Sequence, residues 1–173
     1  FLSLAAVGLV WFAARQPETL PAEKRRPLRI RPVLSAMGET LRHPVSRGYA
    51  ISAGLVFGSF VGFLTTVQPA LEKLYGVGDT FALYFAVLAI TIGAASITNS
   101  RLVMRLGMLR LCIAGLAGLM SVAIIGLAVA YANDGVPSLT VLMLLLMPLC
   151  FCFGILFGNF NALSMEPMGH IAG

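Results

Sequence analysis

The chain has 173 residues, of which 58% are hydrophobic and 11% are charged, and its mean hydropathy is +0.91. An ordinary soluble domain carries about 25% charged residues, and a domain of this size could not bury so much apolar surface. The composition excludes a disordered, a collagen-like and a disulfide-stapled secreted chain. The net charge of +5 lies mostly between apolar stretches, which indicates membrane topology and not nucleic-acid binding.

The first segment, residues 1–14, is apolar but too short to cross a bilayer, which takes about 20 helical residues. Because it starts without a methionine, we expect it to be the end of a transmembrane helix that begins outside this sequence.

Residues 15–47 follow as a basic linker, and its proline-rich first part is expected to be irregular. Its second part, about 33–43, predicts a short amphipathic helix at the membrane surface. The apolar face of that helix consists of Val33, Leu34, Met37 and Leu41.

The remainder, residues 48–173, contains four long charge-free stretches. Because they are continuous and do not alternate every second residue, they predict transmembrane helices and not barrel strands. We expect complete spans at about 47–68, 80–100, 109–131 and 138–160, and the start of another near residue 170. The sequence therefore predicts an all-α integral membrane protein with four complete transmembrane helices, two partial ones and one interfacial helix.

Lysine and arginine are distributed unevenly among the connecting segments. Residues 15–47 contain eight of them, residues 69–79 one, residues 101–110 three and residues 132–137 none. Since cytoplasmic loops are enriched in these residues, 15–47 and 101–110 are predicted to face the cytoplasm.

The middle of every complete span lacks Asp, Glu, Lys, Arg and His. If a proton or ion gradient drives the protein, its titrating groups are expected outside these spans. The sequence contains no nucleophile–base pair, phosphate-binding loop or metal-ligand spacing, so we predict no enzyme activity, cofactor or metal. Cys112, Cys150 and Cys152 are interpreted as small apolar packing residues.

The span 47–68 has two different faces. Gly54, Gly58 and Gly62 form a small-xxx-small stripe, which predicts close contact with another helix. Ser59, Phe63 and Thr66 lie beside it, and they either line a substrate path or have hydroxyls bonded to their own helix. The opposite arc is expected to face lipid and consists of Val56, Phe57, Phe60, Val61, Leu64 and Val67.

The span 138–160 places a second set of candidates on one arc. Met143, Met147 and Phe151 are expected either to line the substrate path or to serve plain helix packing. Gly154 and Gly158 are expected to allow close helix contacts.

Several motifs resemble one membrane-protein family. Pro17-Glu18-Thr19-Leu20 precedes the basic linker, Gln68-Pro69 and Tyr75-Gly76 follow the next span, and Gly158-Asn159-Phe160-Asn161-Ala162-Leu163 ends the last complete one. This order is similar to the central loop and C-terminal half of a major facilitator superfamily transporter, and especially to the Bcr/CflA drug-resistance family. Leu102, Arg105 and Gly107 resemble the superfamily's cytoplasmic-loop motif, although Met104 stands where the fuller motif has Asp.

The resemblance implies part of a 12-helix bundle in the bacterial inner membrane. It implies proton-coupled export of drugs or small metabolites by alternating access, with a small apolar or amphipathic substrate and the lipid bilayer as partners. Two alternatives remain open: a major-facilitator importer of a sugar, amino acid or organic acid, and a polytopic membrane protein that does not transport.

Overall fold

The structure, a computed structural model, describes residues 2–16 and 30–168. Residues 17–29, which include the Pro-Glu-Thr-Leu motif, and the expected start of a span near residue 170 lie outside the described residues. The chain divides into two compact units at Ser35. In the first unit, α1 (Leu2–Arg15) is an exposed apolar helix, and the Arg15 guanidinium lies 5.2 Å from the centre of the Trp11 ring.

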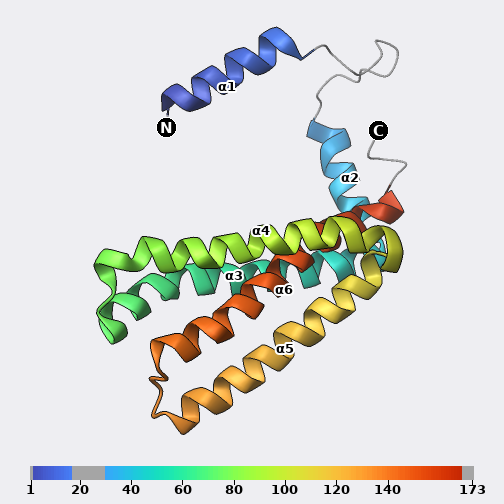
Figure 1. The fold of residues 1–173 in the computed structure, drawn as a ribbon. Helices are drawn as coiled ribbons and strands as arrows, with labels where there is room; N and C mark the ends of the chain where they lie inside the picture. The colour runs from blue at the N-terminus through green and yellow to red at the C-terminus, as the bar shows by residue number, and fades with distance from the viewer. Residues whose placement is uncertain (1, 17–29, 169–173) are drawn as a thin grey trace. The chain divides into compact units, whose positions relative to one another are not determined.

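The described residues form helices and no strand, and four of these helices are long and apolar enough to cross a membrane. This confirms the predicted all-α membrane class. The elements that follow α1 are α2 (Ile30–Arg42), α3 (Pro44–Tyr75), the 3-10 turn η2 (Gly78–Thr80), α4 (Phe81–Leu106), α5 (Met108–Ala132), α6 (Leu139–Met165) and the 3-10 turn η3 (Glu166–Met168) (Figure 1). The helix α2 begins at Ile30, three residues before the predicted start.

Local chemistry explains both ends of α3. At its start the Ser46 N–H donates to Nδ1 of His43 over 3.4 Å, so the histidine caps the helix. At its end Gly76 adopts the left-handed region (φ 65°), and its N–H donates to the Glu72 carbonyl over 3.2 Å. The helix therefore continues well past the predicted end at residue 68.

The connection between α4 and α5 is shorter than expected. Gly107 alone separates the two helices. Its backbone angles, φ 79° and ψ 157°, are rarely adopted by any residue other than glycine. Leu102 and Arg105 consequently lie in the last turns of α4 and not in a loop. The loop predicted over 101–110 is thus a one-residue turn between two helices.

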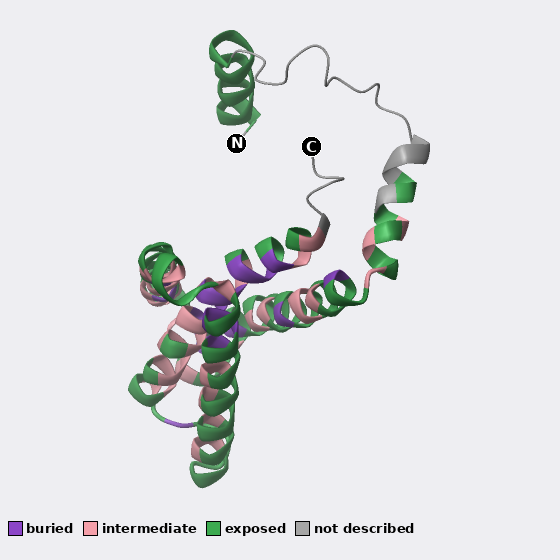
Figure 2. Cartoon of the chain, turned by 90° about the vertical axis from the view of Figure 1, so that its right-hand side faces the viewer, coloured by how far each residue is buried: buried purple, intermediate pink, exposed green. Residues whose placement is uncertain are grey.

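The centre of the bundle is α6, which runs between α4 and α5 in Figure 1 and packs against α3, α4 and α5. The helices α3 and α4 touch each other little. Buried residues gather where these helices cross, and the outward faces are exposed (Figure 2). Three apolar clusters form the core, and each includes residues of α6, among them Cys150, Phe153 and Ile155. The position of α6 therefore decides which residues of the other helices are buried.

Candidate functional site

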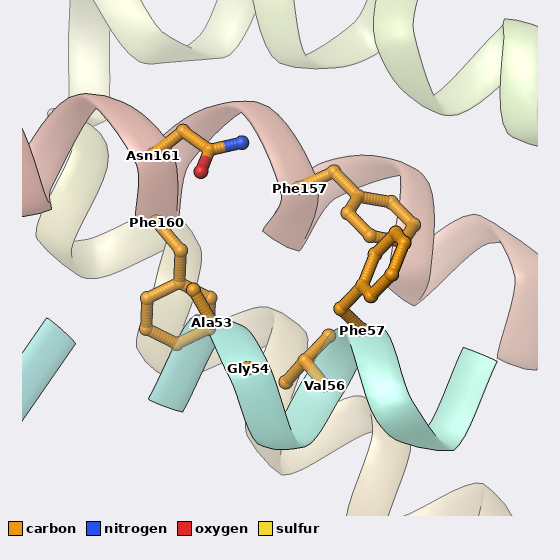
Figure 3. Close-up of a pocket in the computed structure, with 7 residues that line it drawn as sticks. All are labelled: Ala53, Gly54, Val56, Phe57, Phe157, Phe160 and Asn161. Carbon is orange, nitrogen blue, oxygen red and sulfur yellow. The ribbon is translucent and has the colours of Figure 1, made fainter. Parts of the chain in front are cut away.

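A pocket of about 370 Å³ opens between the first half of α3 and the last turns of α6 (Figure 3). Its lining is apolar except for one side-chain amide. The lining residues are Ala53, Gly54, Val56, Phe57, Phe157, Phe160 and Asn161. We call this space the aromatic pocket.

Three phenylalanines give the aromatic pocket its shape. The rings of Phe57 and Phe157 meet edge to face, with centroids 5.9 Å apart and an interplanar angle of 76°. Figure 3 shows these two rings against each other at one end of the pocket and Phe160 at the other. Phe160 is buried, and Tyr49 lies behind it with a centroid distance of 6.5 Å. Such fixed rings offer flat apolar surface to a ligand.

Polar groups at the aromatic pocket are few. Asn161 is exposed, and its amide can both donate and accept a hydrogen bond. Gly54 lines the opposite wall, and a Cβ placed there would have no neighbour within 4 Å among the described residues, which leaves room beside the rings. The arrangement can hold a small apolar molecule and orient one polar group, while it offers no fixed charge.

The predicted substrate-path residues of α3 behave in two ways. The Ser59 hydroxyl donates to the Leu55 carbonyl over 2.9 Å, and the Thr66 hydroxyl donates to the Gly62 carbonyl over 2.8 Å. Both hydroxyls therefore have partners in their own helix, the alternative considered from the sequence. Phe63 instead packs against the core.

Two of the three substrate-path candidates on α6 lie near Phe63 of α3, and the third lies in a different cluster. Met143, Met147 and Phe63 are partly buried around one cluster, which includes Leu71 and Cys150. Phe151 packs in a different cluster, against α4 and α5. A substrate path through all six candidates would have to pass from one side of α6 to another.

The prediction that one arc of α3 faces lipid is wrong for three of its residues. Val56 and Val67 are buried, and Phe60 packs edge to face against Phe153 and Phe157 with centroids 5.2 and 5.1 Å apart. Lipid tails and helix interfaces are similarly apolar, so hydrophobicity does not tell which of the two covers a given arc. The contact with the aromatic face of α6 decides it here.

Close approach of helices occurs at only some of the expected glycines. A Cβ at Gly154 would lie 2.7 Å from the Ala95 Cβ and 3.0 Å from the Ile92 carbonyl oxygen, so α4 and α6 meet there. A Cβ at Gly54, Gly58, Gly62 or Gly158 would have no atom within 4 Å among the described residues, apart from the adjoining residues and backbone of its own helix. That these four glycines contact another helix therefore stays a prediction, and the partner helix would lie outside the described residues. Sequence reasoning missed Gly115 and Gly118, which approach Leu156 and Cys152 of α6.

An interhelical amide pair was also missed. Asn159 of α6 donates to Oδ1 of Asn99 of α4 over 2.6 Å and to the carbonyl of Ile155 over 2.8 Å. Asn159 is 2% exposed. The signal in the sequence was an asparagine in each of two apolar spans, but their pairing depends on how the helices are aligned.

Comparison with known proteins finds two relatives of this chain. The chain is 27% identical over 167 residues to the uncharacterized MFS-type transporter YdgK of Bacillus subtilis, a match that covers 93% of this chain and 40% of YdgK. It is 32% identical over 117 residues to the bicyclomycin resistance protein homolog of Haemophilus influenzae, covering 65% of this chain and 29% of that protein. The resemblance to Bcr/CflA-type major facilitator transporters is confirmed.

This Bcr/CflA-like chain spans less than half the length of each of these two relatives. No family model matches it, and no solved structure matches it significantly. Membrane transport is therefore supported by two sequence matches together with the four apolar helices.

Proposed function

We propose that the chain is part of a proton-coupled efflux transporter that exports small apolar or amphipathic molecules by alternating access. The observation that carries the proposal is the aromatic pocket between α3 and α6, which combines three phenylalanines with one amide. The name of the Haemophilus influenzae relative, a bicyclomycin resistance protein homolog, favours export over import.

The pocket chemistry agrees with broad selectivity. Aromatic walls bind molecules of different shape through surface contact, and a single amide imposes little discrimination. Because α3 to α6 carry no Asp, Glu, Lys, Arg or His in the middle of their spans, the groups that couple transport to protons are expected elsewhere in the protein.

The test is a resistance profile of the intact transporter with Phe57→Ala and Phe157→Ala. We expect each variant to change resistance to some compounds more than to others, because different ligands use different rings. Leu144→Ala serves as the control, since Leu144 is 64% exposed on α6 and does not line the pocket. A protonophore should abolish export by the unchanged protein in inverted vesicles.

If both phenylalanine variants keep the full resistance profile at equal expression, the aromatic pocket is not part of the substrate path. If accumulation of the compounds rises when the transporter is expressed, the importer alternative replaces export.

We further propose that the turn at Gly107 faces the cytoplasm of a bacterial inner membrane, because arginines and lysines gather at this end and in 15–47. Gly78→Cys and Leu106→Cys, made singly, should label differently with an impermeant thiol reagent added to whole cells. Labelling at position 106 and not at 78 would reverse this orientation.

A further inference from the structure

Another pocket, of about 670 Å³, lies where α4 turns into α5, beside the start of α3 and the end of α6. It shares no lining residue with the aromatic pocket. Its lining residues are Tyr49, Arg105, Leu106, Gly107, Met108, Leu109, Arg110, Leu163 and Glu166. We call it the basic pocket, because two arginines line it on either side of the Gly107 turn.

The charges of the basic pocket do not cancel. Arg105 and Arg110 are both exposed, and no ion pair to either guanidinium is present in the part of the chain that the structure describes. Glu166 contributes one carboxylate to the lining. The C-terminus of α4 and the N-terminus of α5 both lie at this turn, so their partial charges of roughly −0.5 and +0.5 offset each other, and the excess comes from two guanidinium groups against one carboxylate. The excess positive charge matches a ligand with one net negative charge.

An exposed apolar stripe leads away from the basic pocket along α5. It begins at the lining residue Leu109, which is 50% exposed, and repeats every three to four residues. The members of the stripe are Leu109, Ile113, Leu116, Met120, Ile124, Leu127 and Tyr131. From Leu109 to Met120 the helix rises about 16 Å, about half of a 30 Å hydrocarbon core, which is the depth of one leaflet.

We infer that the basic pocket binds the headgroup of an anionic phospholipid of the phosphatidylglycerol class. The phosphate lies between Arg105 and Arg110, a headgroup hydroxyl donates to Glu166, and an acyl chain follows the stripe on α5. A zwitterionic lipid has no net charge and leaves the excess positive charge unbalanced. The inference rests on the membrane setting of the proposed transporter and not on its substrate or direction of transport.

The experiment measures lipid retention by the intact transporter. The protein is placed in phosphatidylcholine nanodiscs that contain a minor fraction of phosphatidylglycerol, and bound lipid is counted by native mass spectrometry after release. Arg105→Gln and Arg110→Gln should each reduce phosphatidylglycerol retention about fivefold, since a basic residue near an anionic surface contributes about 1 kcal/mol. The matched control is Arg101→Gln, because Arg101 is exposed on the same helix and does not line the pocket.

Two further arms separate the possible results. The unchanged protein should retain phosphatidylglycerol several-fold better than phosphatidylethanolamine, and this comparison needs no variant that might misfold. Inorganic phosphate at millimolar concentration should not displace the lipid, because it lacks the acyl chain. Equal retention of both lipids, an equal loss in Arg101→Gln, or displacement by inorganic phosphate overturns the inference. None of these results depends on measured transport.

Discussion

The amide pair between α4 and α6 allows a quantitative test of how this bundle is held together. In Asn159→Ala the Oδ1 atom of Asn99 loses its donor, and the Ile155 carbonyl loses a second contact. Side-chain hydrogen bonds between membrane helices contribute about 0.6 kcal/mol on average and about 1.7 kcal/mol at most. Because the Asn159–Asn99 bond is 2.6 Å long and Asn159 is 2% exposed, we expect a coupling free energy of about 1 kcal/mol, or about a fivefold change in the unfolding equilibrium.

A double-mutant cycle isolates this coupling. The unchanged transporter, Asn159→Ala, Asn99→Ala and the double variant are unfolded by denaturing detergent in mixed micelles, and the free energies of unfolding are compared. Asn133→Ala replaces Asn159→Ala in a control cycle, because Asn133 is exposed and its side-chain amide donates to the Val129 carbonyl of the adjoining helix α5, over 2.8 Å. A coupling no larger than that of the control cycle would refute the view that the pair joins α4 to α6.

Three further predictions concern packing, each measured as the free energy of unfolding in the same detergent titration. Gly154→Leu should cost about 3 kcal/mol, the upper end for overpacked interiors, because its Cβ would meet α4, whereas the exposed Gly93→Leu should cost less than about 1 kcal/mol. Phe60→Ala removes three ring contacts and should cost about 2 kcal/mol, against less than about 1 kcal/mol for Leu64→Ala. A larger cost for Leu64→Ala than for Phe60→Ala would support the original prediction that Phe60 faces lipid. Tyr75→Phe should cost about 1 kcal/mol, because its hydroxyl donates over 2.7 Å to a carbonyl in the loop before α6, and an unchanged stability would show that water replaces this bond.

The number and type of the helices could be predicted because a bilayer requires about 20 consecutive apolar residues. The ends of the helices could not be predicted in the same way. The helices α3 and α4 end at Tyr75 and Leu106, beyond the charge-free stretches. Their last turns contain charged residues and were therefore left out of the predicted spans. Hydropathy records the thickness of the membrane, whereas helix length also depends on capping residues such as Gly76 and Gly107.

The faces of the helices were predicted less well than their existence. In water an apolar arc points inward, but in a membrane the lipid-facing and buried arcs have the same chemistry, so Phe60 was assigned to the wrong environment. The pairing of Asn159 with Asn99 depends on the alignment of two helices that are 60 residues apart in sequence. A glycine allows another helix to come close but does not say which glycine of a span is used: a Cβ at Gly154 would lie 2.7 Å from the Ala95 Cβ, whereas one at Gly158 would have no such neighbour among the described residues.

The central position of α6 has a consequence for biosynthesis. During translation α3, α4 and α5 leave the ribosome before the helix that contacts all three of them. Until α6 enters the membrane, Asn99 faces lipid or water without its amide partner. Gly115 and Gly118 of α5 likewise lack Leu156 and Cys152, the residues of α6 that they approach. A chain interrupted before Leu139 would therefore leave α3, α4 and α5 with few contacts to one another and with the Asn99 side chain without its amide partner.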